Sequence, residues 1–156
     1  MTKVLVLIKG LGAGGAERLV VELARAAPRQ GVQVDVVSVL DQKRQLIPEI
    51  EVAGVPVTCL GVRRLRNLRW LGGLVRAVRR SRPDIVHVQS PALAPVVRLA
   101  AHARLFGLRR PRVVTTEHNA RHTYHRVTRL GDALTMFLDD ATIAVSEQVR
   151  SSLTPV

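Results

Sequence analysis

The chain has 156 residues, enough for one domain with an apolar core but too few for two sizeable domains. Hydrophobic residues make up 47% of it and aromatic residues only 3%, so aliphatic side chains must fill the core. The net charge of +12 raises nucleic acid as a partner. One Trp, one Tyr and two Phe offer few rings for base stacking, however, so we expect no nucleic-acid partner.

The cysteine and hydropathy patterns bear on the cellular compartment. The single cysteine, Cys59, cannot form an internal disulfide, and no apolar run approaches the roughly 18 residues that span a bilayer. The opening MTKVLVLIKG places only five apolar residues between two lysines, too few for the core of a signal peptide. These features predict a cytoplasmic protein.

Six apolar runs of strand length recur along the chain, each rich in β-branched residues. They cover residues 3–8, 32–40, 55–61, 84–89, 112–117 and 141–146. Between them, helical patterns cover residues 16–30, 67–80, about 92–106 and about 127–138, and a last helix is expected after Ser146, a good N-cap. Residues 41–53 fit either a short helix or an irregular connection.

Strands that alternate with helices predict right-handed β-α-β units and a mostly parallel, doubly wound sheet. The expected fold class is therefore α/β, a three-layer Rossmann-like domain. In such a sheet, ligands bind at the carboxyl ends of the strands. Residues 9–15, 89–91, 117–125 and the turn at Ser146 are expected at that edge.

The glycine-rich turn between the first strand and the first helix is a candidate phosphate site. Its residues Gly10, Gly12 and Gly15 fit the dinucleotide fingerprint G-x-G-x-x-G. A dinucleotide site also needs an acidic residue at the end of the second strand, about 20 residues on. Counted from Gly15, that spacing leads to Asp35, which lies inside the strand pattern, whereas Asp41 lies at the strand end but further along. The dinucleotide fingerprint is therefore incomplete. A sugar-nucleotide phosphate and a tight turn without ligand remain the other interpretations.

Three histidines invite a metal interpretation. His118, His122 and His125 would share one face of a helix, but a loop would scatter them, and no H-E-x-x-H sequence is present. We therefore expect no metal site. His87 lies inside an aliphatic strand and is expected to be a core histidine.

The stretch from Arg63 to Arg82 combines arginines with apolar residues, namely Leu68, Trp70, Leu71 and Leu74. A basic amphipathic helix can lie on an anionic membrane surface. The favoured alternative is a surface helix whose apolar face packs into the core.

Four segments together resemble the N-terminal domain of family-four glycosyltransferases of the GT-B fold. They are GLGAGGAERLVVELARAAPRQGVQVDVVSV, RPDIVHVQSP, VVTTEHN and DDATIAVSEQVRSSL, in the same order as in the family. The resemblance implies sugar transfer from a nucleotide-sugar donor to a glycan, lipid or small-molecule acceptor. It also implies retention of anomeric configuration and no bound metal or other cofactor.

The resemblance covers only one of the two domains of that fold. Residues 1–156 correspond to the acceptor-side Rossmann-like domain, and the C-terminal domain that mainly holds the donor is absent from the sequence. We expect a truncated gene product or an isolated fragment that folds alone but does not transfer sugar. The implied partners are a nucleotide-sugar, a sugar or lipid-linked acceptor and the missing C-terminal domain. An anionic membrane surface is a further one, with the protein peripheral on its inner face.

Site residues follow from the same resemblance. Gly14, Gly15 and Ala16 match the turn near the donor diphosphate, and His118 matches the histidine near the transferred sugar. An imidazole there can hydrogen-bond a sugar hydroxyl or stabilise an oxocarbenium-like transition state. The expected acceptor-binding residues are Gln89, Ser90, Asn119, Arg121, Tyr124 and Arg126. The alternatives are a nucleotide- or dinucleotide-binding Rossmann domain and a noncatalytic basic binding module.

Overall fold

The computed structural model describes residues 1–67 and 69–153; Leu68, assigned above to the basic stretch, lies outside the described residues. The described residues form one six-stranded sheet in which every pairing is parallel, in the order β3-β2-β1-β4-β5-β6. The strands are β1 (Thr2–Ile8), β2 (Val32–Leu40), β3 (Val57–Val62), β4 (Ile85–Val88), β5 (Arg112–Glu117) and β6 (Ala141–Ala144). The predicted α/β fold is confirmed, and the sheet is entirely rather than mostly parallel.

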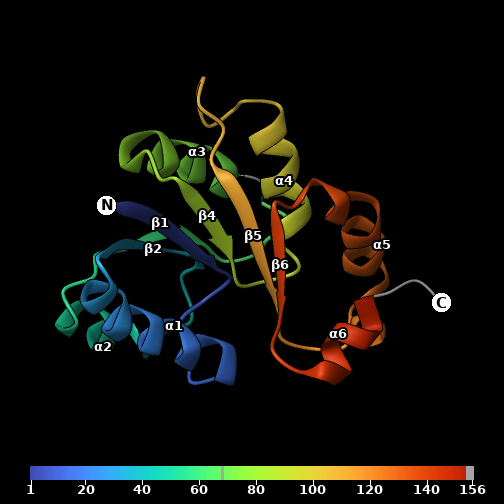
Figure 1. Cartoon of the computed structure of the whole chain (residues 1–156), viewed down its shortest axis with the longest axis horizontal. Coiled ribbons are helices and arrows are strands. Elements are labelled where there is room, and N and C mark those ends of the chain that lie inside the picture. Colours follow the sequence, from blue (N-terminus) through green and yellow to red (C-terminus); the bar gives the residue numbers. More distant parts are fainter. Residues whose placement is uncertain (68, 154–156) are drawn as a thin grey trace.

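Helices cover both faces of this sheet (Figure 1). On one face pack α1 (Gly15–Ala26), which a 3₁₀ turn continues to Gln30, and α2 (Ile47–Val52). On the other lie α3 (Arg69–Ser81) and α4 (Ala94–His102). Helix α5 (Arg126–Thr135), continued by a 3₁₀ turn, Met136–Leu138, packs against α4. The C-terminal helix α6 (Glu147–Leu153) follows β6. Strand order reverses between β1 and β4, which is where doubly wound sheets bind ligands.

Each face of the sheet has its own apolar core. Val6, Ile8 and Val36 point toward α1 and α2, whereas Leu5 and Leu7 point toward α3 and α4, as the period of two along a strand requires. On the second face α3 buries apolar side chains of the basic stretch, namely Trp70, Leu74 and Val78. The interpretation of this stretch as a surface helix with a core-facing apolar side is therefore confirmed, and its arginines cover the outside.

Local signals explain where the expected elements begin and end. The ambiguous segment 41–53 contains the short helix α2. Ser146 caps α6, because the N–H of Val149 donates to its Oγ at 3.2 Å. The helix expected to reach residue 106 was predicted too long. It ends at His102, after which Arg104 takes a φ of 56° and the N–H of Leu105 turns back to the carbonyl of Ala100.

Among the described residues, no helix is both long enough and apolar enough to cross a membrane.

Candidate functional site

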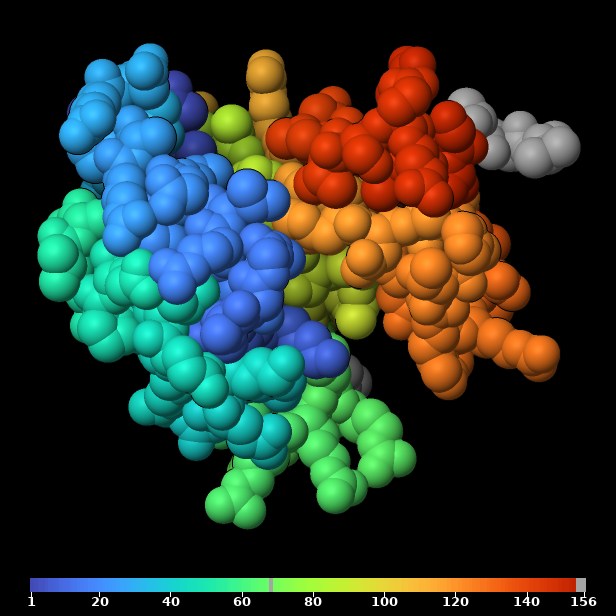
Figure 2. All heavy atoms as spheres, turned by 90° about the horizontal axis from the view of Figure 1, so that it is seen from below, coloured from blue at the N-terminus to red at the C-terminus, as the bar shows by residue number. Residues whose placement is uncertain are grey.

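The carboxyl ends of β1, β4 and β5 meet at one edge of the sheet, which Figure 2 views end on. This edge is hollowed between α1 (blue) and the segment that follows β5 (orange), with residues after β4 (yellow-green) deeper between them. Ser90 Oγ accepts a hydrogen bond from the N–H of Lys9 at 3.0 Å, which ties the end of β4 to the glycine turn. Three of the segments expected at this edge are therefore brought together.

Within the glycine turn, the first two glycines serve packing. A Cβ on Gly10 would lie 3.0 Å from Lys43 Cβ, and one on Gly12 would lie 3.3 Å from Lys43 Cδ. The N–H of Leu11 donates to the carbonyl of Lys43 at 2.8 Å, so the turn lies directly against the loop after β2. Close packing against Lys43 therefore explains why the first two positions of the G-x-G-x-x-G match are glycines.

The remaining glycines form the exposed beginning of α1. Gly14 is the N-cap residue, and no side chain caps the helix there. Glu17 folds back so that its Oε2 occupies the place that a Cβ on Gly14 would take. A carboxylate is stabilised at this end by the unpaired N–H groups and the helix dipole. The N-terminus of α1 therefore already has an anion beside it, the carboxylate of Glu17 from its own first turn.

The acidic residue that a dinucleotide site requires is not placed for that role. Asp35 lies on the α3 side of the sheet, opposite to α1, where its carboxylate accepts a hydrogen bond from Ser81 and lies 3.7 Å from Lys3 Nζ. Asp41, at the end of β2, is bound by the guanidinium of Arg44. This geometry weakens the dinucleotide interpretation of the glycine turn.

A chain of polar side chains holds His118 at the same edge. His118 Nε2 donates to Gln89 Oε1 at 2.8 Å, and Gln89 Nε2 lies 3.2 Å from His87 Nε2. His87 in turn contacts Thr116 Oγ1 at 2.7 Å. Because a neutral imidazole has one donor and one acceptor nitrogen, this orientation leaves Nδ1 of His118 as the acceptor.

Burial sets the charge of both histidines. It lowers the pKa of His87 to about 4, with a smaller contribution from the neighbouring His118. Burial also lowers the pKa of His118, while the carboxylate of Glu17 across the recess opposes that shift. Both rings are therefore neutral at pH 7. The expectation that His87 is a core histidine is confirmed by its burial.

The residues expected to bind an acceptor divide into two groups. Asn119 and Arg126 are exposed, and Gln89 is buried in contact with His118. The polar ends of Arg121 and Tyr124 instead point into the protein, toward Asp132 and Glu117. Ser90 is buried, and its hydroxyl is engaged by the backbone of the glycine turn.

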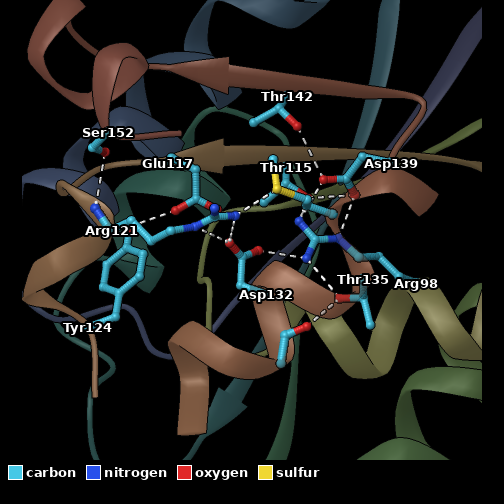
Figure 3. A network of polar contacts seen from close by, with 12 residues as sticks. Arg98, Thr115, Glu117, Arg121, Tyr124, Asp132, Thr135, Asp139, Thr142 and Ser152 are labelled. Carbon is cyan, nitrogen blue, oxygen red and sulfur yellow. Dashed lines mark hydrogen bonds and ion pairs between the residues drawn. The ribbon is translucent and has the colours of Figure 1, made fainter. Parts of the chain in front are cut away.

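An ion-pair network that the sequence did not suggest connects α4 with α5 and with the loop after β5 (Figure 3). Arg98 of α4 is 1% exposed and binds Asp132 at 2.7 Å and Asp139 at 2.6 Å. Arg121 bonds the second oxygen of Asp132 at 2.8 Å. The network therefore ties α4, α5 and the end of the 3₁₀ turn to the loop that carries His118.

Glu117, directly before His118, is 1% exposed, and its Oε1 has no hydrogen-bond partner among the described residues. Its Oε2 accepts from the hydroxyl of Tyr124 at 2.6 Å. Burial raises the pKa of Glu117, and the Tyr124 bond opposes that rise. One hydroxyl therefore supplies the only direct bond to this buried carboxyl in the described chain.

We expect Tyr124→Phe to lower the free energy of unfolding by about 1–3 kcal/mol, because the Glu117 carboxyl then loses its partner. Urea unfolding at pH 7 measures the change. The same substitution in a Glu117→Gln background is the control, since it removes the carboxylate first. Equal losses in the two backgrounds would show that the hydroxyl and the carboxyl are not coupled.

The three histidines that are close in sequence do not come together in the structure. His118 follows β5, His122 lies in the 3₁₀ turn Arg121–Thr123, and His125 caps α5 by accepting from the N–H of Val127 at 3.4 Å. Within residues 1–67 and 69–153, no group of three His, Cys, Asp or Glu side chains is placed to hold a metal ion.

Comparison with solved structures assigns the fold to the Rossmann-like domains of the GT-B class. HepE from Anabaena, solved with UDP and glucose, has a TM-score of 0.66 and 18% identity over 97% of this chain and 40% of its own. MurG from Acinetobacter baumannii has a TM-score of 0.68 and 16% identity over 100% of this chain and 43% of its own. A putative UDP-N-acetylglucosamine 2-epimerase from Listeria monocytogenes has a TM-score of 0.68 and 16% identity over 97% of this chain and 41% of its own. The chain thus spans less than half of each of these proteins, and at these identities the likeness shows the fold alone.

The family follows from the sequence match. The family model described as Glycosyltransferase Family 4 matches residues 13–155, nearly the whole chain. The chain therefore belongs to glycosyltransferase family 4, and the predicted resemblance to its N-terminal domain is confirmed. A search of curated proteins gives no match.

Proposed function

We propose that residues 1–156 form the acceptor-side domain of a retaining glycosyltransferase that uses a nucleotide-sugar donor. One observation carries the proposal: a neutral His118, fixed by Gln89, faces the first turn of α1 across the recess. A donor whose diphosphate lies at Gly14, Gly15 and Ala16 would place its sugar between the two. Family membership supports the reaction class, and the UDP bound in HepE supports the donor class.

The geometry suggests a division of labour. The N–H groups at the beginning of α1 would hold diphosphate oxygens, and the Glu17 carboxylate would move aside to admit them. His118 would accept a hydrogen bond at Nδ1 from a sugar hydroxyl and stabilise positive charge that develops on the ring in the transition state. Neither step requires a metal ion or a cofactor bound by these residues.

For the acceptor, we propose a hydroxyl-rich or anionic molecule on the rim of the recess. We assign Asn119 and Arg126 to this acceptor because both are exposed polar residues. Arg121 and Tyr124 would act indirectly, because their polar ends fix the loop through Asp132 and Glu117. Ser90 would likewise position the end of β4.

We further propose that a polypeptide of these 156 residues does not transfer sugar by itself. Support comes from the solved GT-B chains, of which it spans 40–43%. The test incubates the purified chain with UDP- and GDP-sugars and a glycan or lipid acceptor, and follows release of nucleoside diphosphate. Sustained release by the chain alone would overturn this part of the proposal.

Diphosphate binding can be tested without turnover. Nothing lies within 4 Å of a Cβ built on Gly15, so Gly15→Ala keeps the fold and adds up to about 1 kcal/mol of helix stability. The added methyl group blocks close approach of phosphate, and we expect UDP binding to weaken roughly ten-fold, the value of one charged hydrogen bond. Glu17→Gln is expected to strengthen binding, because it removes the competing carboxylate.

The matched control is Gly72→Ala, which also adds a methyl group to an open glycine of a helix, α3. Amide chemical shifts titrated with UDP measure all four proteins. Equal affinity of the wild type and Gly15→Ala, or shifts remote from residues 14–16, would refute the phosphate site. Tighter binding of NAD(H) than of UDP would favour the dinucleotide alternative. Salt-dependent nucleic-acid binding without any UDP effect would favour a basic binding module.

We propose a cytoplasmic location for the domain, peripheral on the inner face of a membrane when the acceptor is lipid-linked. The exposed arginines of α3 support this, because they form a cationic outer surface suited to anionic lipid.

A further inference from the structure

Helix α5 buries two polar residues and exposes its large apolar ones. The buried residues of this helix are Asp132 and Thr135. The exposed ones include the α5 stripe, which we define as four large apolar side chains on α5 and its 3₁₀ continuation: Val127, Leu130, Leu134 and Phe137. Their exposed fractions are 73%, 61%, 63% and 76%. A surface helix of a soluble domain normally shows the opposite arrangement.

The packing of the inner face fixes this orientation. Asp132 is held by Arg98 and Arg121, and the Thr135 hydroxyl lies 3.1 Å from Arg98 Nη1. At Gly131, a Cβ would lie 3.2 Å from the ring of Pro95, so α5 lies close against α4 there. Turning the α5 stripe inward would break a buried ion pair, and the stripe therefore stays on the surface.

The stripe is spaced along one side of the helix, at i, i+3, i+7 and i+10. This repeat keeps side chains on one helical face. α5 lies at the side of the domain remote from α1 and α2 (Figure 1). Isolated exposed leucines need no explanation, but four aligned apolar side chains indicate a partner.

Charge indicates what that partner is. Arg126 and Arg129 are exposed on the same helix. The one acidic residue between residues 126 and 138 is Asp132, which is buried. An apolar stripe with cations and no exposed acid fits an anionic lipid surface, where the apolar side chains enter the acyl boundary and the arginines contact headgroups.

We propose that the α5 stripe docks this domain on an anionic lipid bilayer. A second copy of the chain is a poorer partner, because a two-fold contact would bring the arginines of both helices together without an acidic residue to pair them. The basic helix α3 cannot supply the apolar contact, since Trp70, Leu74 and Val78 are in the core. Docking by the α5 stripe deepens the peripheral location proposed above and rests on it, but it does not depend on sugar transfer, which the UDP titration tests separately.

The test is flotation of the whole chain with phosphatidylcholine vesicles that contain either no anionic lipid or added phosphatidylglycerol, which gives the surface a negative potential. We expect binding to the anionic vesicles only. The double variant Leu130→Ser/Phe137→Ser is expected to lower partitioning at least about ten-fold, the cost of withdrawing two large side chains from the membrane. Thermal unfolding checks that the variant remains folded, which its exposed positions predict.

Matched controls locate the contact. Leu108 is 92% exposed and lies outside α5, so Leu108→Ser should leave vesicle binding unchanged. Arg129→Gln should reduce binding more than Arg76→Gln, which changes an exposed arginine of α3. Unchanged binding of the Leu130/Phe137 variant, or no binding by the wild type, would overturn the proposal. A dimer in sedimentation equilibrium that the Leu130/Phe137 variant abolishes would assign the stripe to a second copy instead.

Discussion

Replacing Arg98 with methionine is expected to lower the free energy of unfolding by about 3–5 kcal/mol, the cost of breaking a buried ion pair from one side. The guanidinium is 1% exposed, and the side chains of Asp132 and Asp139 are each 2% exposed. Asp132 keeps its bond to Arg121 when Arg98 is lost. Among the described residues, Asp139 then keeps only the hydroxyls of Thr115 and Thr142, so its buried charge accounts for most of the loss.

Urea unfolding at pH 7 measures this effect, and two further variants identify its cause. Arg109→Met removes an ion pair with Asp84 in which the arginine is 87% exposed, and it should cost less than about 1 kcal/mol. Asp139→Asn added to Arg98→Met should recover part of the loss, because it removes the unpaired charge. A double variant no more stable than Arg98→Met would contradict this account.

The network also marks the limit of prediction from sequence. The strands and helices were predictable because apolar residues repeat at periods that each backbone conformation imposes. Arg98 is a charged residue within a helical pattern, and charged residues are usually exposed. The pattern therefore gives no sign that this side chain is buried. Its partners Asp132 and Asp139 lie 34 and 41 residues away, and nothing local signals that they converge.

The candidate site was predictable to a similar degree. The meeting of Gln89 with His118 follows from topology, because both residues come directly after neighbouring parallel strands. The inward direction of Arg121 and Tyr124 does not follow from topology, since it depends on the buried carboxyls of Asp132 and Glu117. For the same reason the pattern at 127–138 predicted a helix but not which of its faces packs on the domain.

Acid is expected to destabilise the domain through His87. Its pKa is about 4 in the folded protein against 6.5 ordinarily, chiefly because burial disfavours the imidazolium. Between these two values the unfolded chain binds the proton more readily than the folded one. The contribution of neutral His87 is therefore complete above pH 6.5 and is lost as pH falls toward 4, up to about 3 kcal/mol at about 1.4 kcal/mol per unit.

His87→Gln separates this effect from the titration of carboxylates, which both proteins share. The glutamine keeps a polar group for Thr116 and Gln89 but binds no proton. We expect the unfolding free energy of this variant, measured in urea from pH 7 to pH 4, to fall less steeply than that of the wild type. His122→Gln, which changes an exposed histidine, is the matched control. Parallel profiles for wild type and His87→Gln would mean that the folded protein accommodates the charged ring, by opening the contact among Gln89, His87 and His118.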